Sequence, residues 1–190
     1  MELNEALSRR YSCRKYAPRP LEREKLIACA EAGRSAPSAC NLQPWVFVAV
    51  DNPQKCAAVA AALSDEDVRV NTFAHTIPAY IVIVGHPPRN PNDKQRLLLS
   101  RHNRPDMDIG IAAENICLAA TAMGLGSIMM GWFRKDVVSE TLNIPPHLEP
   151  ALIIGIGYPQ SEPARRTPRL EAAAIIRFND YNGSMGGDGR

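Results

Sequence analysis

The stretch DIGIAAENICLAATAM, residues 108–123, decides the fold of this chain. Its apolar side chains point in nearly every direction around a helix, and almost no polar face is left before Gly124 ends the pattern. A helix that is apolar on all sides has to be covered on all sides. The stretch therefore predicts a helix that is buried all round.

Strand-like segments lie before and after this helix. Three continuous apolar runs, rich in β-branched residues, predict buried central strands: WVFVAV at 45–50, AYIVIV at 79–84 and ALIIGIG at 151–157. Two shorter segments, SIMM at 127–130 and residues 175–178, predict a short strand and a last strand.

Further helices are expected between the strands. Periodic apolar positions and stop signals place them at 3–7, at 21–30 with Gly33 as the stop, at 53–63 and at 136–142 before Pro145 and Pro146. Either Asp51 or Asn52 caps the third of these. Residues 86–95 read as a proline-rich loop. Strands and helices interleave, which favours an α/β or α+β class with a helix-covered sheet.

Composition limits the kind of protein this is. A chain of 190 residues with 45% apolar and 22% charged residues is typical of one globular domain, which we place at residues 1–181, with a frayed tail at 182–190. A net charge of +2 argues against a nucleic-acid partner. Five scattered cysteines without a C-x-x-C pair indicate reduced thiols, and no apolar run is long enough for a membrane span or placed like a signal peptide. We therefore expect a soluble cytoplasmic protein without a metal site.

The segment RRYSCRKY, residues 9–16, holds a cluster of cations after a helix. In an extended segment Arg10, Ser12 and Arg14 would point to one side, where two guanidinium groups and a hydroxyl could grip a phosphate. A solvated basic helix end, with its arginines beside the carbonyl dipoles, explains the same residues. On this segment alone the second interpretation is favoured.

Three more segments have similar alternatives. The residues of SAPSACNLQPW, 35–45, could lie along a flat polar ring or form an ordinary helix-to-strand turn. The glycines of GLGSIMMGWF, 124–133, could admit a flat group to the backbone or mark a bulge. The arginines of GYPQSEPARRTPR, 157–169, could bind an anion or face solvent.

Taken in this order, the four segments resemble the nitroreductase family of flavin-dependent oxidoreductases, over nearly the whole chain. RRYSCRKY is similar to the family's Arg-Arg-x-Ser-x-Arg-x-aromatic pattern, and APSACNLQPW to its Ala-Pro-Ser-x-x-Asn-x-Gln-Pro-Trp signature, which is the most specific of the matches. The chain looks like the shorter, single-domain branch.

The resemblance implies an α+β fold with a mixed central sheet flanked by helices, and an intertwined homodimer with two FMN molecules at its interface. It also implies cofactor contacts on several segments, some of them reaching the flavin from the partner chain. Those residues are Arg10, Tyr11, Ser12 and Arg14 for the phosphate and ribityl chain, Arg166 or else Arg165 closing the phosphate, Ser38, Ala39 and Asn41 from the partner chain, Met130 and Gly131 facing flavin N5, and Asn71 at the pyrimidine edge.

The implied function is that of an FMN-dependent NAD(P)H oxidoreductase, with FMN bound and NAD(P)H as co-substrate. Flavin N5 does the chemistry, so no protein residue is expected to be catalytic, and a nitroaromatic, a quinone or a similar acceptor follows NAD(P)H in a ping-pong cycle. A flavin carrier or sensor with little turnover is the alternative. The lysine that the family often has near the pyrimidine edge is missing here, where Phe73, Ala74 and His75 stand.

Overall fold

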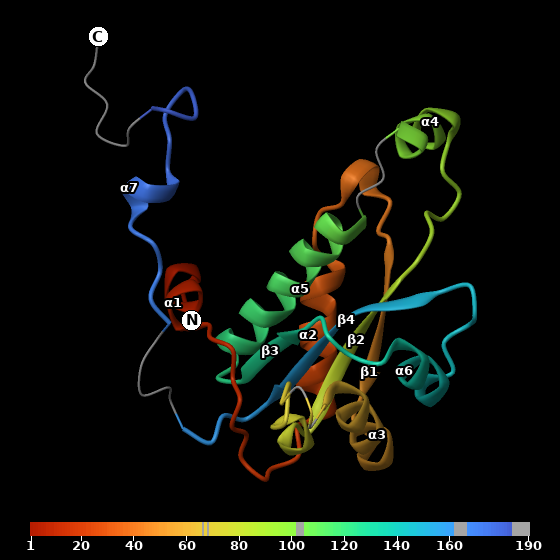
Figure 1. Cartoon of the computed structure of the whole chain (residues 1–190), viewed down its shortest axis with the longest axis vertical. Coiled ribbons are helices and arrows are strands. Elements are labelled where there is room, and N and C mark those ends of the chain that lie inside the picture. Colours follow the sequence, from red (N-terminus) through yellow and green to blue (C-terminus); the bar gives the residue numbers. More distant parts are fainter. Residues whose placement is uncertain (66, 68, 102–104, 162–166, 184–190) are drawn as a thin grey trace.

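A computed structural model describes residues 1–65, 67, 69–101, 105–161 and 167–183. These residues form a four-stranded sheet with helices on both faces, so the α+β class is confirmed (Figure 1). The strands are β1 (Trp45–Val50), β2 (Ala79–Gly85), β3 (Gly126–Met130) and β4 (Glu149–Gly157). The helices are α1 (Leu3–Arg9), α2 (Arg23–Arg34), α3 (Pro53–Leu63), α4 (Asp93–Arg101), α5 (Pro105–Ala122), α6 (Lys135–Leu142) and α7 (Ala172–Ile175), with short 3-10 helices at Ala39–Asn41 and Ala74–Thr76.

The strand order is β1-β2-β4-β3, and every pair of neighbouring strands is antiparallel. The one parallel pairing among the described residues is an isolated bridge between Ser12 and Ser127. β2 and β4 are central, as their apolar runs predict. The prediction that β1 is central is wrong, because β1 pairs with β2 on one side and with no described strand on the other. In this edge strand Val46 is 36% exposed.

The sheet separates two apolar cores. Along β2, Val82 faces the core beneath α3 and α6, whereas Ile81 and Ile83 face the core beneath α2 and α5. Successive side chains of a strand point to opposite faces, so a strand covered on both faces is apolar throughout. This arrangement accounts for the unbroken run AYIVIV.

The contact between α2 and α5 corrects the expected role of Gly33. This residue lies inside α2, which continues to Arg34, and does not stop the helix. A β-carbon at Gly33 would come within 2.8 Å of the Ile116 side chain of α5. Glycine is therefore needed at this position for close packing of the two helices.

α5 is not buried all round in the single chain, contrary to expectation. Ile109, Ala113 and Ile116 are buried against α2 and the sheet. Met107 and Ile111 lie on another side of the helix, and Ile111 is 41% exposed. The described part of the chain thus leaves an apolar stripe of α5 in contact with solvent.

Local signals explain several helix ends. The side chain of Asn52 caps α3, since its Oδ1 accepts a hydrogen bond from the Lys55 amide at 3.0 Å. α6 ends at Asn143, which has a positive φ of 52°, ahead of the two prolines expected to stop it. The expected loop at 86–95 is shorter than predicted, because α4 begins at Asp93.

The predicted last strand at 175–178 is wrong. The chain forms the single turn α7 at Ala172–Ile175, and the segment around it leads away from the sheet (Figure 1). A strand needs a neighbour for its backbone hydrogen bonds, and no described strand lies beside this segment. Residues 184–190, most of the expected tail, lie outside the described residues.

Candidate functional site

The N-terminal cationic segment is fastened to the sheet by its backbone. The Cys13 amide donates to the Ser127 carbonyl at 2.9 Å, and Ser12 forms the parallel bridge with the same residue of β3. Farther along, the Ala17 amide donates to the Tyr158 carbonyl at 2.8 Å. The segment is therefore extended and runs from the beginning of β3 to the end of β4.

The side chains of Ser12, Cys13 and Arg14 alternate, as an extended segment predicts, whereas the neighbours Arg14 and Lys15 are both exposed. Cys13 is buried between the exposed side chains of Ser12 and Arg14, which share one side. Arg14 Nη1 donates to the Ser12 carbonyl at 3.3 Å, and no acidic side chain of the described residues pairs with Arg14 or Lys15. The Ser12 hydroxyl and the unneutralised Arg14 thus share one exposed side at the edge of β3, a suitable setting for an anion.

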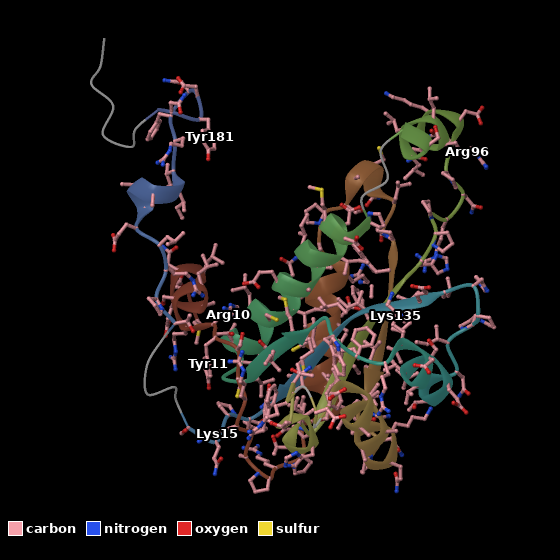
Figure 2. All side chains as sticks on the ribbon, in the orientation of Figure 1. Arg10, Tyr11, Lys15, Arg96, Lys135 and Tyr181 are labelled. Carbon is pink, nitrogen blue, oxygen red and sulfur yellow. The ribbon has the colours of Figure 1, made fainter. Side chains whose placement is uncertain are left out.

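Arg10 and Tyr11, labelled in Figure 2, contact other parts of the chain through their side chains. Arg10 follows the end of α1, and its Nε lies 3.5 Å from Glu114 Oε1 of α5. Its side chain is 21% exposed. The Tyr11 hydroxyl donates to the Ser161 carbonyl at 3.3 Å, which ties the segment to the chain beyond β4. Arg10 therefore already has a carboxylate partner, unlike Arg14.

The loop after α2 carries Ser38, Ala39 and Asn41, and its conformation is unusual. Cys40, Asn41 and Gln43 have φ angles of 52°, 54° and 48°, a region that residues other than glycine rarely adopt. Ser38 Oγ accepts from the Gln43 amide at 2.9 Å, and Asn41 Oδ1 accepts from Gln43 Nε2 at 3.2 Å. Within the single chain these two side chains thus stabilise the loop itself.

Helix α5 shows that the loop and the cationic segment are apart within one protomer. The Ala39 amide donates to Asp108 in the first turns of α5, at 3.2 Å to Oδ1, whereas Arg10 contacts Glu114. Glu114 lies six positions after Asp108, so the backbone positions of the two residues differ by about 9 Å along the helix axis and about 120° around it. Within one chain the two motifs therefore contact different faces of α5.

The end of β3 brings Met130, Gly131 and Asn71 together. Met130 is buried, whereas a β-carbon added at Gly131 would meet no heavy atom within 4 Å. Asn71 Nδ2 donates to the Leu63 carbonyl at 3.2 Å and to the Trp132 carbonyl at 3.5 Å. The backbone at Gly131 is thus open to a flat group, and Asn71 lies beside it. Met130 lies three positions after Ser127 along β3, so the two backbone positions, and with them the cationic segment beside Ser127, are about 10 Å apart.

The remaining predicted contacts are Arg165 and Arg166, which lie outside the described residues. His75, in the stretch where the family often has a lysine, is exposed, and its Nδ1 lies 2.8 Å from the Thr72 carbonyl. Nowhere in the described part of the chain do three or more His, Cys, Asp or Glu side chains gather closely enough to hold a metal ion.

A cavity of about 420 Å³ opens beside the Ser38–Asn41 loop. Ala39 and the first turn of α5 line one part of it, including Asp106, and the start of β4 lines another. At its wall Lys135 Nζ donates to Glu149 Oε2 at 2.9 Å, which lowers the pKa of Glu149. The loop that carries three predicted contacts therefore also borders a space large enough for part of a small molecule.

The buried cysteines are structural. All five thiols are free. Burial raises the pKa of Cys29 to about 12 and the pKa values of Cys56 and Cys117 to about 11. These three thiols stay protonated near neutral pH and are poor nucleophiles.

Sequence reasoning missed the acidic partners of the two motifs. Asp108 anchors Ala39 and Glu114 pairs with Arg10, yet both belong to a helix interpreted as purely apolar packing. Their presence among apolar residues of α5 was the one available signal. The sequence does not indicate that Asp108 accepts a hydrogen bond from Ala39, which lies 69 positions earlier.

Comparison with known proteins agrees with this fold. The profile of the nitroreductase family matches residues 7–158. An NADPH-dependent oxidoreductase from Staphylococcus epidermidis is 26% identical over 192 residues, which cover 95% of this chain and 74% of that protein. An FMN-dependent nitroreductase from Clostridium difficile has 25% identity and a TM-score of 0.74, with 93% of this chain and 98% of that chain covered. A nitroreductase family protein from Streptococcus pneumoniae, at 23% identity, has the same fold with a TM-score of 0.77 over 93% and 99% of the two chains.

The chain belongs to the nitroreductase family, as its four motifs predict. The match spans the N-terminal segment, the loop after α2, α5 and the strands through β4. Among the described helices, none has the length and apolar character needed to cross a membrane.

Proposed function

We propose that this protein is an FMN-dependent NAD(P)H oxidoreductase that passes electrons to a nitroaromatic, a quinone or a similar acceptor. Family membership and the names of its relatives support the enzyme class and both cofactors. The observation that carries the proposal is the extended segment at the edge of β3. There Ser12 and Arg14 share one exposed side, and Arg14 has no acidic partner among the described residues.

The residues present fit FMN at both of its ends. Ser12 and Arg14 would hold the phosphate, together with Arg10 and Tyr11. The open backbone at Gly131 would lie against the ring, with Asn71 at its edge. When bound, FMN would supply the redox chemistry, with its N5 as the hydride acceptor between NAD(P)H and the second substrate. The chain positions both substrates, and no side chain has to act as acid or base.

A homodimer completes the site in this proposal. Within one protomer, Ser38, Ala39 and Asn41 lie on a different side of α5 from the cationic segment, so a second copy is needed to supply the loop. The exposed stripe of α5 and the C-terminal arm, residues 167–183, offer apolar surface for that copy. The arm leads away from the sheet and exposes Ile175, Phe178 and Tyr181 (Figure 1).

In this proposal NAD(P)H and the acceptor bind one after the other at the same site. NAD(P)H and the acceptor both have to reach the same exposed ring face, which requires one to leave before the other binds. The cavity beside Ala39 borders the loop that would cover the partner's flavin, and it can receive part of the acceptor. The free thiols fit a reducing compartment, so we place the enzyme in the cytoplasm.

The visible spectrum of the purified protein tests this function. We expect a yellow protein that releases FMN on denaturation, is bleached by NADH or NADPH without oxygen, and regains its colour when a quinone is added. A protein that takes up no FMN would overturn the proposal. Bound FMN that NAD(P)H does not reduce would instead indicate a flavin carrier or sensor.

A further inference from the structure

A cluster of four polar side chains lies next to the proposed phosphate site but outside it. Tyr158 directly follows β4, and its hydroxyl donates to Glu22 Oε2 at 2.7 Å. Lys25 Nζ donates to the same hydroxyl, and Arg19 lies over the aromatic ring, with Cζ 3.8 Å from the ring centre. Arg19 Nη2 also donates to Glu22 Oε1 at 2.8 Å. We call Arg19, Glu22, Lys25 and Tyr158 the Tyr158 cluster.

The cluster is closed, because each member contacts at least two of the other three. Isolated ion pairs on a surface contribute little, but groups that share partners hold one another in place. The hydrogen bond from Tyr158 is the main reason that the pKa of Glu22 falls to about 2, so this carboxylate stays ionised at neutral pH. The hydrogen bond with Tyr158 also raises the pKa of Lys25, so Glu22 and Lys25 carry opposite charges at neutral pH.

The cluster connects two parts of the chain that flank the phosphate site. Beside it, the Ala17 amide donates to the Tyr158 carbonyl, and the Gln160 amide donates to the Lys15 carbonyl at 3.0 Å. Lys15 is the neighbour of Arg14, and the chain after Gln160 leads to Ser161, whose carbonyl accepts from Tyr11. The ladder of residues 15–17 with 158–160 thus adjoins the cationic segment directly.

Tight packing leaves this ladder little freedom. A β-carbon at Gly157 would come within 2.5 Å of the Pro78 side chain and 2.9 Å of the Tyr16 ring. The Tyr16 hydroxyl donates to the Gly155 carbonyl at 3.4 Å. The Tyr158 side chain closes the outer side of the ladder, where it joins residues 19–25 to the end of β4.

We propose that Tyr158 is a positioning residue for flavin binding: through Glu22, Lys25 and Arg19 it fixes the cationic segment against the end of β4 and so aligns Ser12 and Arg14 on the FMN phosphate. This inference rests on the proposed function. It assigns a role to side chains that do not themselves touch the cofactor. Because the alignment concerns the phosphate, the cluster strengthens the binding of FMN but not that of riboflavin, which has the same ring and ribityl chain without a phosphate.

The test compares FMN and riboflavin binding in Tyr158→Phe, which keeps the ring under Arg19 and removes the hydroxyl. The full chain is stripped of flavin, and each ligand is titrated while flavin fluorescence is followed. We expect the Kd for FMN to rise about fivefold, the effect of roughly one hydrogen bond. The Kd for riboflavin should stay unchanged. Glu22→Gln removes the charge at the centre of the cluster and should reproduce this selective loss.

Arg23→Gln is the matched control. Arg23 lies on α2 next to Glu22 and forms an exposed pair with Asp51, with Nε 2.6 Å from Oδ2. It takes no part in the cluster, so the preference for FMN over riboflavin should match that of the wild type. An unchanged preference in both Tyr158→Phe and Glu22→Gln, or an equal weakening of both ligands, would overturn the positioning role. A wild-type protein that binds riboflavin as tightly as FMN would overturn the phosphate site itself, and the inference with it.

Discussion

Cys13 lies directly against Gly126: a β-carbon added at Gly126 would come within 2.8 Å of Cys13 Cβ and 2.7 Å of its Sγ. Cβ is bonded to the backbone and cannot rotate out of the way. The cationic segment can therefore lie on β3 only because residue 126 has no side chain.

Replacing this glycine is expected to lift the segment from the sheet. Gly126→Ala should lower the free energy of unfolding of the flavin-free protein by roughly 1–3 kcal/mol, the usual cost of overpacking, and should weaken FMN binding as well. Chemical denaturation measures the first effect. Gly131→Ala is the control for stability, because open space surrounds that position, and its unfolding should match the wild type within about 0.5 kcal/mol. Equal stability of the two variants would contradict the close packing.

Charge reversal at Arg14 should remove most of the affinity for FMN. Arg14→Glu replaces an unneutralised cation by an anion that repels the phosphate, so binding should weaken by roughly 2–5 kcal/mol, or about 30-fold and more in Kd. The apo fold should survive, because the Arg14 side chain is exposed. Lys55→Glu, an equal charge change on the exposed side of α3, should bind FMN normally. If Arg14→Glu retained its flavin, the phosphate assignment would be wrong.

Complementation between protomers tests the shared site. Arg14→Glu and a bulky Asn41→Trp should each give homodimers with little flavin. In a mixed dimer both lesions fall into one site and leave the other intact, so about half of the FMN occupancy should return, as two-fold symmetry requires. Co-expression with two affinity tags isolates the mixed species. Heterodimers as empty as the homodimers would show that a single chain supplies both motifs.

Steady-state kinetics test whether NAD(P)H and the acceptor bind in turn at the same face of the flavin ring. Initial rates at several fixed acceptor concentrations, with NAD(P)H varied, should give parallel double-reciprocal lines. Lines that intersect would require both substrates on the enzyme together.

Acid titration provides a separate test of the Tyr158 cluster. The pKa of Glu22 is lowered from its ordinary value of 4.5 to about 2, so its ionisation stabilises the folded state above about pH 4.5, and this contribution is lost as the pH falls toward 2. Tyr158→Phe removes the largest cause of the shift. The free energy of unfolding should therefore depend less on pH in this window for Tyr158→Phe than for the wild type. Identical slopes would mean that Tyr158 does not stabilise the carboxylate.

The sequence by itself determined the elements whose signals are local. Continuous apolar runs identified β1, β2 and β4, and the alternation around Cys13 correctly placed Ser12 and Arg14 on one side of an extended segment. Asn52 and Pro53 marked the start of α3. In each case the physical cause lies within a few residues. Side chains alternate along a strand, and the side chain of the capping residue accepts a hydrogen bond from the backbone amide three positions later.

Only the tertiary structure decided which elements have neighbours and which charges have partners. β1 has the composition of a central strand but lies at an edge, and residues 175–178 have that of a strand but no described strand to pair with. The sequence predicts that Gly33 stops a helix, whereas in the structure it lies inside α2 and packs against Ile116. The bonds of Ala39 with Asp108 and of Tyr158 with Glu22 join residues 69 and 136 positions apart. Contacts over such separations exist only once the chain has closed around its core, so no local pattern in the sequence could have revealed them.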